Sequence, residues 1–113
     1  MNKWLIAALA SIAMCGSAQA QSLNSLDVSI VTTGGTAVTA LNAGHRTKGG
    51  WLTNPSTASV NLCINERGPA TMTAGGDVTC IVPGQTYVLA ANGSAVSVVA
   101  SDSGHQFSGY GWY

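Results

Sequence analysis

Hydrophobic and polar residues alternate with a period of two along most of the chain after residue 21, and this alternation predicts half-buried β-strands. In the stretch ASVNLCIN, for example, Val60, Leu62 and Ile64 face one way and the residues between them face the other. The same pattern recurs in LDVSIVT, DVTCIV, QTYVLA and AVSVVAS. No segment after residue 21 shows the 3.6-residue period of an amphipathic helix.

Turn-forming residues separate these strands. Residues 26–41 predict a hairpin that turns at TTGG, and Asn92-Gly93 predicts a second hairpin turn between QTYVLA and AVSVVAS. Asn54-Pro55 and Pro83-Gly84 end the strands before them. About eight short strands with turns every eight to twelve residues predict an all-β fold, a single small antiparallel β-sandwich or barrel.

The first twenty residues, MNKWLIAALASIAMCGSAQA, predict a bacterial-type secretory signal peptide. Lys3 supplies the positive charge, an apolar run follows, and Ala18-Gln19-Ala20 is a small-x-small cleavage site. The apolar run is too short for a membrane span, and Met14 is not the small residue that lipidation of Cys15 would need before it. We therefore expect a signal peptide at 1–20 and one β domain at 21–113, exported to the periplasm, the cell surface or the outside.

Charged side chains are few, at 7% of the chain. After the leader, three basic residues stand against four acidic ones, a net charge of −1 (3 − 4). Nucleic-acid binding requires a basic face, which this composition cannot form. A weakly charged surface gives little electrostatic resistance to self-association, so a homo-oligomer is one possible assembly.

Two cysteines, Cys63 and Cys80, remain after the leader in a chain predicted to be exported. An even number of cysteines in a small exported domain predicts a disulfide, which closes a loop of about 18 residues and stabilises the fold by roughly 3 kcal/mol. A lone cysteine pair with two distant histidines does not supply the ligand set of a metal site. We expect neither a metal nor a cofactor.

The stretch GHRTKGG, residues 44–50, resembles a phosphate-binding loop without matching one. The lysine precedes the second glycine, and a strand follows where a helix would be needed. Arg46 and Lys48 are therefore candidate anion contacts, but the favoured interpretation is a solvated connecting loop. In INERG, Glu66 and Arg67 predict a local ion pair or hydrogen bonds to turn amides.

The stretch SDSGHQ places Asp102, Ser103 and His105 close together and suggests a Ser-His-Asp hydrolase. Catalytic triads are spatial arrangements with an oxyanion hole, and the chain has no G-x-S-x-G nucleophile elbow. We therefore expect a protein that is not an enzyme, with His105 hydrogen-bonded near the start of a strand.

The C-terminal HQFSGYGWY is rich in aromatic residues and carries no charged side chain. Phe107, Tyr110 and Trp112 are predicted either to pack against the core or to form a contact surface for a partner, with carbohydrate stacking as an alternative. A strand without charges must be paired inside the sheet, covered, or used to recruit another chain.

From Arg46 to Phe107 the chain resembles a small β domain of tailed-phage virion proteins such as head-fibre and decoration proteins. The matching positions are Arg46, the NPS at 54–56, the glycine-to-threonine stretch 68–71, the PG at 83–84 and the hairpin segment 95–99. The resemblance implies a small β domain that works in assembly. The signal peptide and the cysteine pair depart from that pattern and favour a bacterial exported protein that shares the architecture.

These observations predict a non-catalytic exported β domain that acts by binding or assembly. The predicted partner is a protein, a glycan or a second copy of the chain. A small secreted hydrolase using Asp102, Ser103 and His105 is one alternative, and a phage decoration or fibre component is another.

Overall fold

The computed structural model describes residues 23–113, so the predicted signal peptide at 1–20 lies outside the described residues. The described residues form ten short strands: β1 (Leu23–Ser25), β2 (Ile30–Val31), β3 (Val38–Leu41), β4 (Gly50–Thr53), β5 (Leu62–Asn65), β6 (Val78–Ile81), β7 (Thr86–Leu89), β8 (Val96–Val99), β9 (His105–Gln106) and β10 (Ser108–Trp112). The prediction of an all-β fold is confirmed. Residues 23–113 contain no helix with the length and apolarity that crossing a membrane would take.

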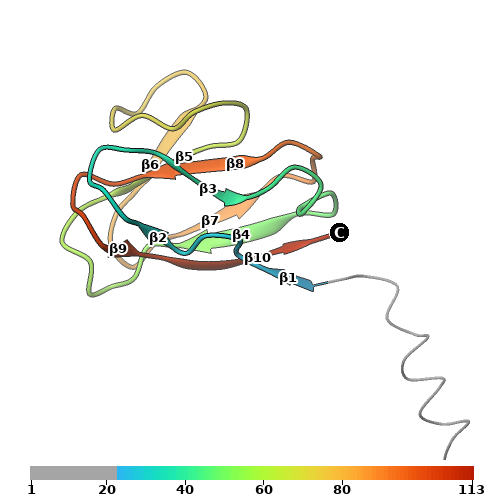
Figure 1. Ribbon diagram of the computed structural model, residues 1–113, viewed down its shortest axis with the longest axis horizontal. Coiled ribbons are helices and arrows are strands. Elements are labelled where there is room, and N and C mark those ends of the chain that lie inside the picture. Colours follow the sequence, from blue (N-terminus) through green and yellow to red (C-terminus); the bar gives the residue numbers. More distant parts are fainter. Residues whose placement is uncertain (1–22) are drawn as a thin grey trace, which may run out of the picture.

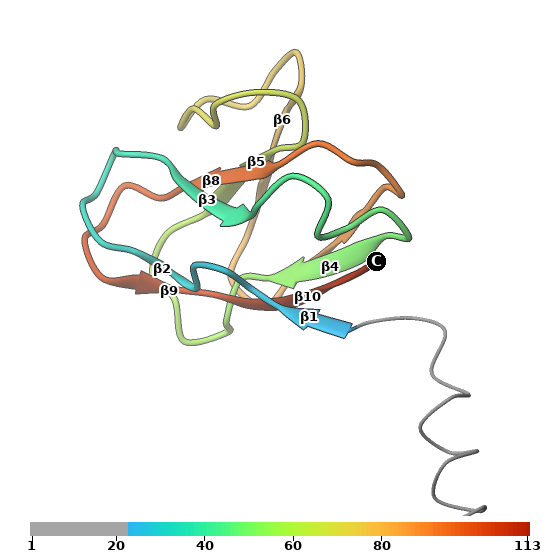
Figure 2. The ribbon, with the colours of Figure 1, turned by 45° about the vertical axis from the view of Figure 1, so that its right-hand side comes forward.

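The strands form two antiparallel layers, which Figures 1 and 2 show one above the other. One layer has the strand order β1-β10-β4-β7, and the other has the order β3-β8-β5-β6. The short pair β2-β9 continues the β1-β10 ribbon, because the Phe107 N–H donates to the Ser29 carbonyl between the two pairs. The arrangement is sandwich-like, which resolves the choice between sandwich and barrel.

The core lies between the two layers. Its buried aliphatic and aromatic residues come from both, namely Val31, Ala40, Leu41, Leu52, Leu62, Ile64, Ile81, Leu89, Val96, Val98, Ala100 and Phe107. The alternation of the sequence supplies these residues, since every second side chain of a strand points into the layer between the sheets.

The predicted hairpin over 26–41 is wrong. β2 pairs with β9 and β3 pairs with β8, so the TTGG segment carries the chain from one layer to the other. Gly34 makes this crossing possible because a Cβ there would collide with the Ser101 carbonyl, and its N–H donates to Ser103 Oγ at 2.9 Å. The turn therefore docks on the segment that precedes β9 instead of closing a hairpin.

The predicted hairpin at Asn92-Gly93 is also wrong, because the strands on its two sides belong to different layers. β7 pairs with β4 in one layer, while β8 lies between β3 and β5 in the other. The Asn92 side chain still makes the local turn, since its Oδ1 accepts the Ser94 N–H at 2.7 Å. Local turn chemistry was predicted correctly, but the pairing partner is decided by the packing of the two layers.

Strand β5 is buried on both faces, unlike the half-buried strand that alternation predicts. Its second face is covered by the segment 66–77, which forms the loop at the top of Figure 1. Asn65 organises this loop because its amide accepts the N–H groups of Arg67 and Gly68 and donates to the Pro69 carbonyl. Ala70 of the loop packs with Cys63 and Val99.

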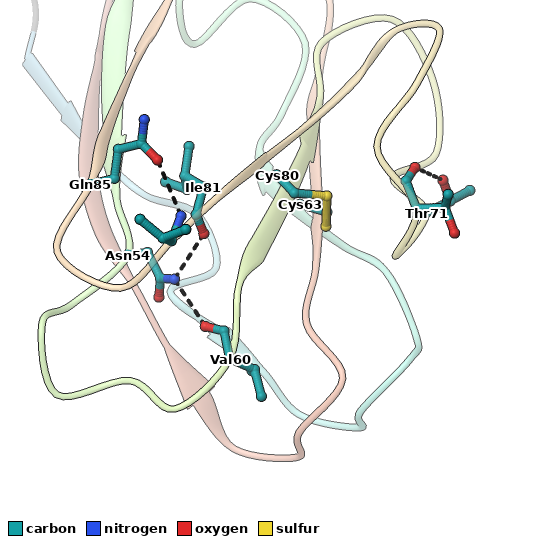
Figure 3. Close-up of a disulfide and its surroundings, with 9 residues drawn as sticks. Asn54, Val60, Cys63, Thr71, Cys80, Ile81 and Gln85 are labelled. Atoms are coloured by element: carbon teal, nitrogen blue, oxygen red, sulfur yellow. Dashed lines mark hydrogen bonds between the residues drawn. A yellow bond between two sulfur atoms is a disulfide. The ribbon is translucent and has the colours of Figure 1, made fainter.

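The predicted disulfide is confirmed. Cys63 and Cys80 lie directly opposite each other in the β5-β6 ladder, with their Cα atoms 3.9 Å apart, and their sulfur atoms are bonded (Figure 3). The bond joins two neighbouring strands under the loop 66–77.

Strand β10 is an interior strand, paired with β1 on one side and β4 on the other. Its glycines do not leave an open face for an outside molecule. A Cβ at Gly109 would collide with the Trp51 carbonyl, and one at Gly111 would collide with the His45 carbonyl. The glycines are needed because the chain's own backbone approaches this strand closely.

Candidate functional site

Arg46 is the largest fully buried side chain, with 0% of its surface exposed. Its guanidinium donates to the Glu66 carboxylate, and also to the carbonyls of Ser94, Ala90 and Glu66, each at 2.9 Å. These acceptors come from the segment after β5 and from the crossing between β7 and β8. Arg46, from the loop 44–50, therefore supplies buried hydrogen-bond donors to backbone carbonyls that lie outside the strands.

Glu66 completes this network. Its Oε2 accepts the Tyr87 hydroxyl at 2.7 Å, and its Oε1 accepts the Ala90 N–H at 2.9 Å. Burial raises the pKa of the Tyr87 phenol above its ordinary value of 10.0, and the hydrogen bond and negative charge of Glu66 raise it further. The arrangement is one of structural support, since each charged atom is directed at protein groups.

The structure corrects two interpretations of charged residues. Arg46 is not available to an external anion, because its guanidinium is enclosed by protein acceptors. Lys48 is exposed, and anion contact remains a prediction for that residue. Glu66 pairs with Arg46 across twenty residues rather than with its neighbour Arg67, which lies 3.9 Å from Asp77 in an exposed pair.

His105 lies at the start of β9 with 4% of its surface exposed. Its Nδ1 is 2.8 Å from Asp102 Oδ1, and its Nε2 is 2.8 Å from Asn54 Oδ1. Asn54, itself fully buried, donates from Nδ2 to the carbonyls of Val60 and Ile81, as Figure 3 shows. The sequence indicated the Asp102–His105 contact by proximity but gave no sign of Asn54, which is 51 residues away.

Ser103 does not join this group. Its hydroxyl accepts the Gly34 N–H, and both ring nitrogens of His105 face Asp102 and Asn54. A serine nucleophile needs a free imidazole nitrogen within hydrogen-bond distance, and this histidine offers none. A groove of about 290 Å³ lies beside His105, lined also by Asp102 and by Thr57 and Ser59 of the turn after β4.

The outer face of the sheet β1-β10-β4-β7 carries a row of apolar side chains, of which Tyr110 and Val88 are exposed and Trp51 is half-buried. Tyr110 lies directly opposite Trp51, and Trp51 lies directly opposite Val88, so the row crosses three neighbouring strands. The Trp51 and Tyr110 rings meet edge to face, with centroids 5.4 Å apart and planes at 63°. Val88 is the most exposed large hydrophobic residue among those described, at 77%.

Hydroxyl groups border this row, and charges are absent from it. Ser25 continues it on β1, and Ser108, Thr53 and Thr86 form the next row, in which the two threonine hydroxyls lie 2.7 Å apart. The four strands contain no Asp, Glu, Lys or Arg. We call the outward side chains Ser25, Trp51, Thr53, Thr86, Val88, Ser108 and Tyr110 the aromatic face.

The C-terminal residues predicted as a contact surface divide between core and surface. Phe107 is 4% exposed and packs in the core, which corrects its assignment to a contact surface. Tyr110 is exposed on the aromatic face, and Trp112 lies two residues further along the same strand. A hollow of about 520 Å³ lies between the Trp51–Tyr110 pair and the segment 25–29. Val88 was missed because a single valine in an alternating strand gives no sign of which face it occupies.

Among residues 23–113, no three His, Cys, Asp or Glu side chains gather in a way that would hold a metal ion. His45 contacts the Asp27 carboxylate at 2.8 Å and stacks near Tyr113, with ring centroids 5.7 Å apart.

Comparisons of the chain with models of protein families, with curated proteins and with solved structures found no match.

Proposed function

We propose that the chain is a non-catalytic exported β domain that binds a protein partner through the aromatic face. The observation that carries the proposal is the row Tyr110–Trp51–Val88, which runs in register across three strands and ends on a valine that is 77% exposed. In a single sandwich Val88 and much of Tyr110 stay in contact with water, while a partner would remove them from it.

The composition of the aromatic face matches the centre of a protein–protein contact. Tryptophan and tyrosine are enriched in such contacts, and charged residues are depleted at their centres. The four strands beneath this face carry no charged side chain. The complementary surface on the partner is therefore uncharged and largely apolar, because a charged group placed here would lose water without gaining a counter-charge.

A protein fits this face better than a glycan does. A sugar ring stacks on flat, open aromatic surfaces, and the Trp51 and Tyr110 planes are inclined at 63° to one another. The row also ends at β7, which is an edge strand of four residues without charge, proline or bulge. An edge of this kind is open to pairing with another chain.

The cross-strand disulfide supports the exported location. Cys63 and Cys80 lie in neighbouring strands, and their bond persists in oxidising compartments outside the cytoplasm. The signal peptide predicted from residues 1–20 leads to the same location. Assembly into a virion, which the resemblance to phage decoration domains implies, would use the same face, and the identity of the partner distinguishes the two settings.

The test uses Val88 and a matched control. Val82 is also a valine and is 53% exposed, but it lies after β6 and outside the aromatic face. A photo-reactive phenylalanine derivative placed at position 88 should crosslink to a partner in the envelope fraction of the producing organism. The same group at position 82 should not.

The partner is then purified and its Kd measured for the wild-type chain and for Val88→Glu and Val82→Glu. We expect Val88→Glu to weaken binding at least about tenfold, because it buries an unpaired charge at the contact, and Val82→Glu to leave the Kd unchanged. Equal effects of the two variants would overturn the proposal. Binding to a glycan array that is lost in Trp51→Ala would replace the protein partner with a sugar.

The hydrolase alternative is tested on the same preparation. Turnover of an ester, peptide or glycoside substrate that disappears in His105→Ala would contradict a purely binding role. The occupied nitrogens of His105 and the separate hydrogen bond of Ser103 argue against such turnover.

A further inference from the structure

The hydrogen bonds around His105 determine how many protons this buried site holds. Each ring nitrogen faces a different side-chain oxygen. Nδ1 lies 2.8 Å from the Asp102 carboxylate oxygen, and Nε2 lies 2.8 Å from the Asn54 amide oxygen. With 4% of the residue exposed, the ring depends mainly on these two partners for its hydrogen bonds. The protonation of the ring must therefore agree with what these two partners present.

The orientation of the Asn54 amide is set by its other neighbours. Its nitrogen faces the carbonyls of Val60 at 3.0 Å and Ile81 at 3.1 Å. A flipped amide would place its oxygen against both carbonyl oxygens and lose two hydrogen bonds in a fully buried position. The amide oxygen therefore faces His105 and can only accept, so Nε2 must carry a hydrogen.

The other nitrogen faces a carboxylate, which also accepts. We infer that His105 is held as a doubly protonated imidazolium, paired with Asp102, and acts as a pH-sensitive lock between the two layers of the sandwich. If the second hydrogen resides on the Asp102 oxygen instead, the number of protons in the pair is the same. In either form the site holds one proton more than a neutral imidazole beside a carboxylate.

Asp102 is the one charged group that faces the ring among the residues packed around it. Across the β2-β9 ladder, Val31 is its partner, and the turn after β4 presents Thr57, Ala58 and Ser59 beside the groove. No second carboxylate and no cation from these elements competes for the proton. The state of the lock thus depends on the Asp102–His105 pair alone.

The direction of the pH effect follows from the number of protons that the His105–Asp102 pair holds. Below about pH 6.5, the ordinary midpoint of a histidine in an unfolded chain, the proton is present in both states and the lock is closed. As the pH rises above that value, the folded site must bind an extra proton or lose a hydrogen bond. The stability contributed by the lock is therefore lost toward alkaline pH, and the link from His105 through Asn54 to Val60 and Ile81 loosens.

Nitrogen NMR of the imidazole rings in the whole domain tests the inference directly. At neutral pH, we expect both His105 nitrogens to carry hydrogens, and the signals of His45, whose Nδ1 contacts the Asp27 carboxylate near the surface, serve as an internal comparison. A neutral His105 with one bare nitrogen at neutral pH would overturn the inference.

A second measurement tests the lock. In Asp102→Asn the new amide can turn its NH₂ toward Nδ1, so a neutral ring would have both hydrogen bonds satisfied. From about pH 5 to about pH 9 the thermal midpoint of the wild-type domain should fall by roughly 5 °C more than that of Asp102→Asn. Identical pH profiles for the wild type and Asp102→Asn would overturn the lock, even if both nitrogens proved protonated.

Discussion

Replacing Arg46 by methionine is expected to be among the most destabilising single changes in the domain. The guanidinium is fully buried and donates to one carboxylate and three backbone carbonyls. Methionine is of similar length but supplies none of these donors. The change leaves the Glu66 carboxylate without its counter-charge, and it leaves the carbonyls of Ala90 and Ser94 without a donor.

The magnitude follows from the burial of the pair. Removing one partner of a buried ion pair costs about 3–5 kcal/mol. Because the Glu66 side chain is 19% exposed and keeps its bonds to Tyr87 and the Ala90 N–H, we expect the lower end, about 3 kcal/mol. A domain of this size has a total stability of roughly 5–10 kcal/mol, so the loss is a large share of it.

Urea unfolding followed by circular dichroism measures the effect. With a slope of about 1 kcal/mol/M for a small disulfide-bonded domain, the midpoint should fall by about 3 M. Arg67→Met is the matched control, since Arg67 is 77% exposed and lies 3.9 Å from an exposed Asp77. It should change stability by less than about 0.5 kcal/mol. If Arg46→Met unfolds at the wild-type midpoint, the buried guanidinium does not stabilise the fold.

Three further outcomes follow from the fold. Replacing Cys63 and Cys80 by serine should lower the free energy of unfolding by about 2–5 kcal/mol, and free thiols found in the natural protein by peptide mapping would contradict the bond. Deleting residues 109–113 should unfold the domain, as seen by circular dichroism, because β10 pairs on both sides; a folded product would show that this strand is dispensable. Tyr87→Phe should make the domain less sensitive to alkali. The raised pKa of the phenol means that its contribution is complete below about pH 10 and lost as the pH rises further, so equal alkaline unfolding of both proteins would refute it.

The sequence by itself determined the local structure of this protein. Period-two alternation is a property of neighbouring residues, and it correctly indicated strands around Ile64, Val78 and Val96, with no helix among residues 23–113. The pairing of Cys63 with Cys80 could also be predicted, because the two cysteines that remain after the predicted leader, which holds Cys15, allow only one intramolecular bond. Asn92 was correctly identified as a turn residue, since its side chain bonds the backbone two positions later.

Tertiary structure alone decided which strands pair and where the few polar side chains go. Two strands joined by a short turn can close a hairpin or pass to opposite layers, and the docking of Gly34 on Ser101 selects the crossing. Arg46 looked like a surface charge because its acceptors, at Glu66, Ala90 and Ser94, lie twenty or more residues away. A buried charge is tolerated only where all its partners meet, and that meeting depends on the assembled layers rather than on any one stretch of the chain.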